Sequence, residues 1–360
     1  MKRNMIKRIA AVAMAGAMMV SMSVPAMAEE LGTKIEFEKK LAMEEYVYVP
    51  NTSYSFTVRA AQNSECTPVN KHSVEPGDVN ALIGLTDGKL VIETKEELVG
   101  THTSAAEIKT VGTATLEINP LKFKKPGIYR YAITEDDLSY EGISKGANNT
   151  TQYLDAYIIN DGKGSYAVKY FVLTSAATKD EKNDGKFENT YTTNEVSVKK
   201  IVNGEQSYVE EGEGFNFTIT VKPGNPSDEQ YCVVKGNEVL SPDTEKTEDG
   251  SYKWTVKLND QETVKIHGLT ASDSYTVTED DYSATGWKTA VSATGSADED
   301  ETNTRKAAGS GNDNGNVEVT NTKDAPTPTG IVMDIAPYII MVAAAGVLAF
   351  VFLRRRSYTK

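Results

Sequence analysis

The sequence has few of the residues that many secreted proteins and metalloenzymes depend on. Its 360 residues include only two cysteines, Cys66 and Cys232, and three histidines, His72, His102 and His267. Two cysteines so far apart in the chain cannot form a disulfide framework, and we expect two free thiols rather than one long-range bridge. The scattered histidines lack metal-ligand spacing, so we expect neither a metal site nor a cofactor. Stability must therefore have another source.

The central part of the chain also has almost no helical periodicity. Short alternating segments occur instead, separated by Gly, Asn and Asp turns, and examples are "YSFTVRA", "TATLEI", "FNFTITV" and "YKWTVKL". β-branched and aromatic residues at a period of two are typical of strands with one buried face. We therefore expect an all-β fold built from β-sandwich domains.

The two ends of the chain carry targeting signals. A basic start, an apolar run and the small-residue site Ala26-Met27-Ala28 are typical of a signal peptide, which we place at residues 1–28. A second apolar stretch at 331–353 is followed directly by three arginines. Its length suits a membrane span with a cytoplasmic tail, either as a permanent anchor or as a transient one.

The exported part of the chain has far fewer basic than acidic residues. Removing residues 1–28 and everything after Thr329 leaves 38 − 8 = 30 basic and 51 − 1 = 50 acidic residues, a net charge of −20. Such an acidic surface argues against nucleic acid as a partner and favours solubility outside the cell.

Sequence segments recur in the same order in two halves. "IEFEKKL", "YSFTVRA", "GIYRYAITEDD" and "GKFENTY" occupy residues 35–191, and "VSVKKIV", "FNFTITV", "DSYTVTEDD" and "VEVTNTK" occupy residues 196–323. We expect two β-sandwich domains, at about 29–192 and 193–323, with insertions in the first between residues 60 and 120.

A period of two along these strands carries three polar residues of each half onto the apolar face. The first strand contributes a lysine, a middle strand a glutamate and the last strand an asparagine. These residues are Lys39, Glu135 and Asn189 in the first half, and Lys200, Glu279 and Asn321 in the second. One polar residue at a strand end is usually exposed, but six in the same order are hard to ascribe to chance.

Burial changes the chemistry of these groups. Desolvation favours the neutral form of a lysine amine and of a glutamate carboxyl group. A neutral amine is a nucleophile, an asparagine amide can release ammonia, and a glutamate can polarise the carbonyl group and carry the proton. The residues alone leave two hypotheses open. One is a Lys–Asn amide formed without enzyme or cofactor, and the other is a buried Lys–Glu ion pair hydrogen-bonded to Asn.

The contexts of these residues resemble a known family. The segments are "VPNTSYSFTV", "FKKPGIYRYAITED", "KFENTY", "VSVKKIVNG", "YTVTEDDY", "VEVTNTKDAPTPTG" and "DIAPYI". Together they are similar to two-domain backbone pilins of Gram-positive bacteria, particularly the streptococcal T-antigen type. The resemblance implies two tandem Ig-like (CnaB-like) sandwiches in a structural protein that is not an enzyme. It also implies two autocatalytic isopeptide bonds, Lys39–Asn189 assisted by Glu135 and Lys200–Asn321 assisted by Glu279.

The resemblance further implies a cell-wall sorting signal at 324–360, made of PTPTG, the apolar span and the basic tail. A sortase would cleave between Thr329 and Gly330. The common signal has leucine and proline where this chain has Pro326 and Thr327, so the match is to the family's V-P-T-G variant with threonine for valine.

In such pilins the new threonine carboxyl group joins a lysine of the next subunit. Lys182 matches that lysine best by spacing, with Lys179 and Lys186 as alternatives. The implied partners are a pilus-class sortase, identical subunits, minor pilins and peptidoglycan. The implied location is a wall-attached pilus on the cell surface that supports adhesion, with only a transient membrane anchor.

Two other classes of protein are alternatives. A wall-anchored monomeric adhesin with the same domains needs the sorting signal but no acceptor lysine. A secreted hydrolase that uses Glu135 or Glu279 is disfavoured, because neither glutamate has a nearby acid partner or a Ser/His arrangement, and the two belong to different repeats.

Overall fold

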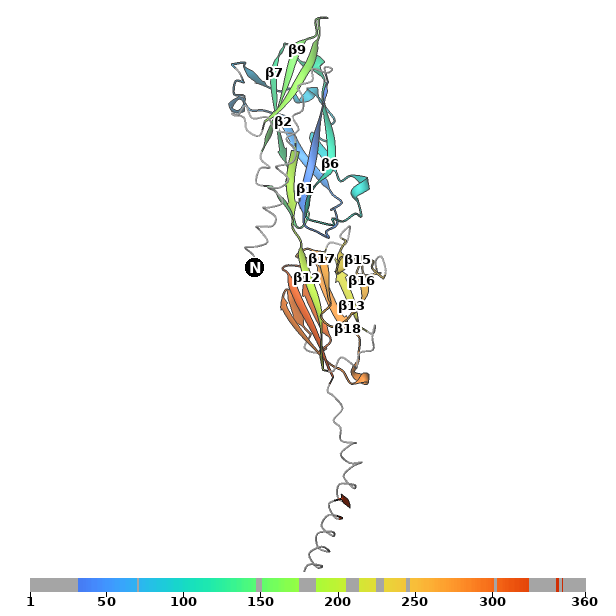
Figure 1. The fold of residues 1–360 in the computed structure, drawn as a ribbon. Helices are drawn as coiled ribbons and strands as arrows, with labels where there is room; N and C mark the ends of the chain where they lie inside the picture. The colour runs from blue at the N-terminus through green and yellow to red at the C-terminus, as the bar shows by residue number, and fades with distance from the viewer. Residues whose placement is uncertain are drawn as a thin grey trace, which may run out of the picture.

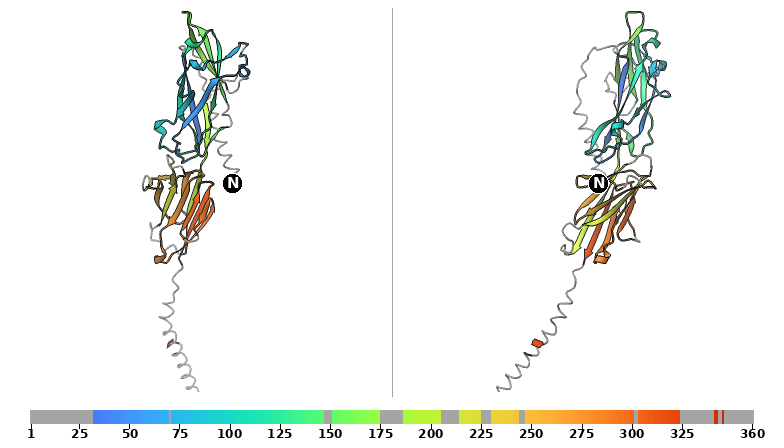
Figure 2. Two further views of the ribbon diagram at one scale, coloured as in Figure 1. Left: turned by 180° about the vertical axis from the view of Figure 1, so that it is seen from behind. Right: turned by 90° about the vertical axis from the view of Figure 1, so that its right-hand side faces the viewer.

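The computed structural model describes residues 32–69, 71–146, 151–174, 186–204, 214–224, 230–243, 247–300 and 303–323, with 341, 342 and 345. Two β-sandwiches lie end to end (Figure 1), and the two views of Figure 2 show the same arrangement from other sides. The predicted all-β, two-sandwich fold is confirmed. The predicted signal peptide, and the sorting segment apart from those last three positions, lie outside the described residues. Within the described chain, no helix is long and apolar enough to span a membrane.

The first sandwich consists of two sheets joined by loops and short 3₁₀ turns. Its strands are β1 (Lys34–Met43), β2 (Ser53–Ala60), β3 (Val74–Pro76), β4 (Leu82–Ile83), β5 (Lys89–Glu93), β6 (Glu107–Ile118), β7 (Gly127–Glu135), β8 (Ile143–Lys145), β9 (Gln152–Asn160), β10 (Tyr166–Thr174) and β11 (Lys186–Tyr191). One sheet has the order β4-β6-β1-β11-β8. The other has the order β10-β9-β7-β2-β5, with β3 paired to β7.

The second sandwich also has two sheets. Its strands are β12 (Asn194–Gly204), β13 (Phe215–Lys222), β14 (Cys232–Lys235), β15 (Glu238–Leu240), β16 (Tyr252–Leu258), β17 (Thr263–Leu269), β18 (Ser274–Glu279), β19 (Lys288–Gly295), β20 (Ala297–Glu299), β21 (Lys306–Ser310) and β22 (Gly315–Lys323). The sheet orders are β15-β14-β17-β12-β22-β19 and β16-β13-β18-β21-β20.

The two sandwiches share one topology. The order β4-β6-β1-β11-β8 corresponds strand by strand to β14-β17-β12-β22-β19, and β9-β7-β2-β5 corresponds to β21-β18-β13-β16. In both, the first and last strands are parallel neighbours, β1 with β11 and β12 with β22. This pairing brings the two ends of each repeat side by side, although most of the repeat separates them in the sequence.

Alternating strands place a separate core inside each sandwich. In β13, Phe215, Phe217, Ile219 and Val221 are buried, while the residues between them are partly exposed. Burying a side chain of this kind is worth about 1.5–3 kcal/mol, so these four residues alone hold β13 firmly against the facing sheet. The core of the first sandwich is equally well buried and includes Phe37. Buried and partly exposed residues alternate along β1 and β2 in a similar way.

The two sandwiches also touch each other. Only two residues separate β11 from β12. From the first sandwich, Glu141 Oε1 accepts a hydrogen bond from the main-chain N–H of Ser272 at 3.1 Å. The ring of Tyr46 lies 5.3 Å from that of His267, measured between ring centres. The joint is therefore a short connection with side-chain contacts across it.

Candidate functional site

Strand register sets the lysine and the asparagine of the first sandwich beside each other. In the parallel pair of β1 and β11, Lys39 lies opposite Phe187 and Leu41 lies opposite Asn189. Lys39 and Asn189 are thus offset by two residues, and side chains two apart in a strand share a face. Both therefore point into the sandwich.

The second sandwich repeats this register. In the parallel pair of β12 and β22, Lys200 lies opposite Val319 and Val202 lies opposite Asn321. The offset is again two residues, in the same direction, so the lysine and the asparagine again share the buried face.

The glutamate comes from the facing sheet. Glu135 is the last residue of β7 and lies opposite Phe56 of β2. Glu279 is the last residue of β18 and lies opposite Phe217 of β13. β7 and β18 occupy equivalent places in the two sandwiches, so the glutamate lies at the same position of the fold in both.

In the first site the three side chains meet at one oxygen atom. Lys39 Nζ donates to Oε1 of Glu135 at 2.8 Å, and Asn189 Nδ2 donates to the same oxygen at 2.7 Å. Lys39 and Asn189 are fully buried, and Glu135 is 3% exposed. The amine and the amide are therefore held next to each other, out of contact with water.

The second site has the same geometry. Lys200 Nζ lies 2.9 Å from Oε1 of Glu279, and Asn321 Nδ2 donates to that oxygen at 3.1 Å. All three residues are fully buried. Asn321 Oδ1 has no hydrogen-bond partner among the described residues, so the carbonyl group of this amide is not held by a donor of its own.

Aromatic rings surround both amines. Lys39 Nζ lies 5.0 Å from the ring centre of Tyr54, and Lys200 Nζ lies 4.3 Å from that of Phe215. Burial lowers the pKa of Lys39 to about 8, against the opposing attraction of Glu135, and burial also lowers the pKa of Lys200. Desolvation thus favours the neutral form of these two amines more than in an exposed lysine.

Three further residues at these sites were missed by the sequence analysis. Lys145 Nζ donates to the main-chain oxygen of Glu135, Arg305 Nη1 to that of Glu279, and Thr289 Oγ1 to Oε2 of Glu279. No local motif marks these residues. The only signal is strand pairing, which a single sequence does not state.

Most of the remaining predicted residues are not described by the structure. Lys179, Lys182, Thr329 and Gly330 lie outside the described residues, and Lys186 is placed only as the first residue of β11. Both cysteines are free thiols in this structure. Within the described ranges, no cluster of His, Cys, Asp or Glu could hold a metal ion.

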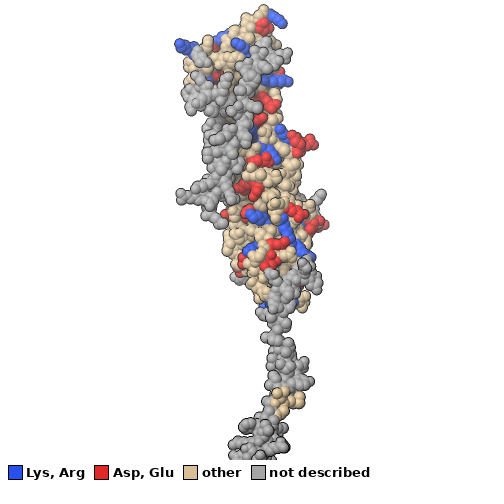
Figure 3. Space-filling model, viewed as in Figure 1, with Lys and Arg blue, Asp and Glu red and all other residues tan. Residues whose placement is uncertain are grey.

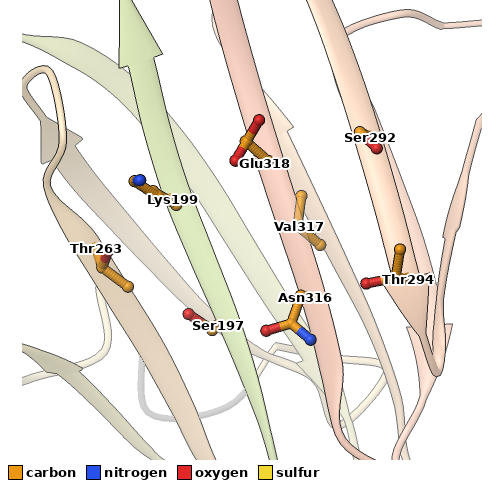
Figure 4. A pocket seen from close by; sticks show the side chains of 8 residues that line it. All are labelled: Ser197, Lys199, Thr263, Ser292, Thr294, Asn316, Val317 and Glu318. Carbon is orange, nitrogen blue, oxygen red and sulfur yellow. The ribbon is translucent and has the colours of Figure 1, made fainter.

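One hollow on the outer surface lies in the second sandwich. Figure 4 shows this hollow, which β17, β12, β22 and β19 line with small polar side chains, Lys199 and Glu318. Lys199 faces this hollow, whereas its neighbour Lys200 points to the opposite, buried side of the same sheet. On the face seen in Figure 3, acidic and basic side chains are intermixed.

Comparison with known families finds a different matching domain for each half of the chain. Residues 35–192 match the Spy0128-like isopeptide containing domain, and residues 194–323 match a domain of unknown function (DUF7601). The first match bears out the predicted resemblance to backbone pilins of the streptococcal T-antigen type.

Individual relatives agree with this class. The chain is 26% identical over 336 residues to a pilin of Streptococcus pyogenes serotype M1, covering 89% of this chain and 90% of that protein. The solved major pilin T3.2 of Streptococcus pyogenes has a TM-score of 0.55 at 22% identity, covering 83% of this chain and all of that one. A second Streptococcus pyogenes major pilin has a TM-score of 0.55 at 21% identity, covering 81% and 99%. The structural likeness shows the fold, and the relatives support a structural subunit of a pilus.

Proposed function

We propose that this chain is the repeating subunit of a covalent cell-surface pilus, stabilised by amide bonds between Lys39 and Asn189 and between Lys200 and Asn321. One observation carries the proposal. In each sandwich a single buried glutamate oxygen lies within 3.1 Å of both the lysine Nζ and the asparagine Nδ2. Fixing two reactants in this way replaces a chance encounter by a high effective concentration.

The bond can form with every atom and proton accounted for. The lysine ammonium passes one proton to the glutamate carboxylate, and the neutral Nζ attacks Cγ of the asparagine. The glutamic acid hydrogen-bonds the oxygen on which negative charge develops, and relays a proton to Nδ2. The Cγ–Nδ2 bond breaks, ammonia leaves, and the second lysine proton remains on the glutamate. The products are a secondary amide, ammonia and a glutamic acid.

The alternative hypothesis, an ion pair without covalent chemistry, uses the same starting contacts. A buried ion pair is by itself weak evidence for stability, because desolvation offsets much of the attraction. The hydrogen bond to asparagine belongs to both hypotheses, so the contacts alone do not separate them. The match of residues 35–192 to an isopeptide containing domain favours the covalent hypothesis.

Polymerisation involves residues that lie mostly outside the described ranges. A sortase cleaves between Thr329 and Gly330 and transfers the Thr329 carboxyl group to Lys182 of the next subunit, with Lys179 and Lys186 as alternative acceptors. The likeness to pilins, the apolar span and the basic tail support this route. The finished polymer is attached to peptidoglycan, carries minor pilins and supports adhesion.

Surface material from the producing cell tests the polymer. Tandem mass spectrometry should find a peptide that joins Thr329 to Lys182, and hot detergent should leave a ladder of high-mass species. Lys182→Ala should abolish the ladder, whereas Lys163→Ala, at an exposed lysine of the first sandwich, should not. A wall-attached species of single-subunit mass in the unmodified strain would instead support the monomeric adhesin.

A further inference from the structure

Both sandwiches place a residue directly opposite the asparagine on the neighbouring strand. In the first, β8 pairs with β11 and sets Lys145 opposite Asn189. In the second, β19 pairs with β22 and sets Thr289 opposite Asn321. β8 and β19 occupy the same place in the two sheet orders. Lys145 and Thr289 are therefore the same position of the fold.

This residue reaches across to the facing sheet and binds the glutamate in both copies. Lys145 Nζ donates at 2.8 Å to the main-chain oxygen of Glu135. Thr289 Oγ1 donates at 3.0 Å to Oε2 of Glu279, the carboxylate oxygen opposite the one that meets Lys200 and Asn321. Each contact ties the sheet that carries the asparagine to the strand end that carries the glutamate.

In both copies a basic side chain donates a hydrogen bond to the main-chain oxygen of the glutamate. The two basic residues come from different parts of the fold. In the second sandwich the residue is Arg305, just before β21, whose Nη1 donates to the main-chain oxygen of Glu279 at 3.0 Å. Each cation also faces the third residue of the repeated Glu-Asp-Asp motif. Lys145 Nζ lies 2.8 Å from Asp137 Oδ1, and Arg305 Nη2 lies 4.0 Å from Asp281 Oδ2. The repeat of these acids in the sequence thus has a structural reason.

The position of the glutamate explains why such contacts are needed. Glu135 and Glu279 are the last residues of their strands, and one more main-chain hydrogen bond to the neighbouring strand follows each of them, from Asp136 and from Asp280. Amide formation requires the reacting atoms at contact distance, and a displacement of about 1 Å can cost two orders of magnitude in rate. A carboxylate at a strand end meets that requirement only if something else restrains it.

We propose that Lys145 and Thr289 are positioning residues for amide formation, each holding the glutamate of its sandwich where one oxygen meets both lysine and asparagine. This inference rests on the proposed function, because it assigns roles in the same reaction. Lys145 has a second effect, since its positive charge opposes protonation of Lys39. The charged groups that act on Lys39 are Glu135, Glu188 and Lys145.

The second site is tested in an Asn189→Ala background, in which only one bond can form. The chain is made by cell-free translation and quenched at intervals, and its intact mass follows the loss of ammonia, about 17 Da. Thr289→Val should slow the reaction about tenfold, which corresponds to about 1.4 kcal/mol in the barrier and lies within the range for one lost hydrogen bond. Thr289→Ser should restore the rate, and Thr294→Val, at an exposed threonine of the same strand, should leave it unchanged.

The first site is tested in an Asn321→Ala background. Lys145→Met should slow the reaction and move the alkaline limb of its pH profile to higher pH, because a charge that disfavours the Lys39 ammonium is gone. Lys145→Arg should restore both the rate and the profile. Lys163→Met, which removes an exposed lysine elsewhere in this sandwich, is the matched control.

The outcomes separate the two proposals. If neither background loses ammonia, the proposed function itself is wrong. If both backgrounds react, and folded Thr289→Val and Lys145→Met react as fast as the backgrounds, the positioning role is overturned. Fluorescence of Trp254 and Trp287, the two tryptophans of the chain, reports folding of the second sandwich. Thr289→Ala takes the place of Thr289→Val if that variant does not fold.

Discussion

At the scale of single residues, burial determines the chemistry of these sites. A lysine in water is almost entirely protonated, but Lys39 is enclosed by Tyr54 and Phe56 and its pKa falls to about 8. Glu135 opposes this shift by attraction. The reaction proposed for each sandwich moves a proton from the lysine to the glutamate, first to free the amine and then to release ammonia.

This requirement predicts a pH dependence for the first bond. Above a pH of about 8 Lys39 is mostly neutral, so it has no proton to pass through Glu135 to Nδ2 of Asn189. The rate of ammonia loss in the Asn321→Ala background should therefore fall as the pH rises through this value. Timed intact-mass measurements across neutral and alkaline pH give the profile. A rate that keeps rising above that range would contradict a mechanism in which the Lys39 proton is passed through Glu135 to the leaving ammonia.

Replacing one glutamate should block one bond alone. Glu279→Gln keeps the shape of the side chain and one acceptor oxygen but cannot accept and return a proton. The variant should lose one ammonia per chain, and peptide mapping should place the remaining amide between Lys39 and Asn189. Glu135→Gln should give the reverse pattern. Two amides in either variant would show that the glutamate is dispensable.

The sequence was sufficient for the three central groups of each site but not for their supports. Strand alternation distinguishes Lys39 from Lys40, and the structure places Lys39 inside and Lys40 only partly buried. Lys145, Thr289 and Arg305 could not be found this way. Their role depends on which strands are neighbours, and sequence period carries no information on pairing between distant strands.

At the scale of the elements, the parallel pairing of first and last strands decides what a cross-link does. A bond across β1 and β11, or across β12 and β22, closes nearly the whole sandwich into one loop. The repeat in the sequence predicts two similar sandwiches. The parallel contact between their terminal strands is a property of the sheet order and could not be derived from composition or alternation.

The loops predict large stability effects. They span 189 − 39 = 150 and 321 − 200 = 121 residues. If the amide acts like a disulfide on the unfolded chain, each bond contributes about 5 kcal/mol. Asn189→Ala should therefore lower the melting temperature and protease resistance of the first sandwich, and Asn321→Ala those of the second. Calorimetry with limited proteolysis checks this, and unchanged transitions would contradict it.

Force should distinguish the two bonds. If tension enters at Lys182 and leaves at Thr329, the path runs through Asn189 and Lys200 and then across the second bond to Asn321. Asn321→Ala should restore unfolding of the second sandwich, with about 400 Å of extension from its 121-residue loop. Asn189→Ala should not lengthen the subunit, because the first bond lies off this path. Equal lengthening of both variants in single-fibre pulling would refute Lys182 as the attachment point.

At the scale of the whole molecule, stiffness depends on the joint between the sandwiches. Glu141 accepts hydrogen bonds from Ser272 N–H at 3.1 Å, from Ser272 Oγ and from Thr270 Oγ1 at 3.4 Å. Glu141→Ala removes all three contacts, so small-angle scattering should show a broader distribution of end-to-end lengths. The melting transitions of the two sandwiches should change little. Glu238→Ala, at an exposed glutamate on the β15 hairpin, is the control. An unchanged distribution in Glu141→Ala would show that other contacts set the joint.

The two amide bonds are the central claim, and the intact mass of the folded protein tests it most directly. Residues 29–323, folded without added enzyme or cofactor, should be lighter than the sequence mass by two ammonia molecules, about 17 Da each. Asn189→Ala and Asn321→Ala should each show one loss, and the double variant none. A folded, unmodified protein at its full sequence mass would contradict the account.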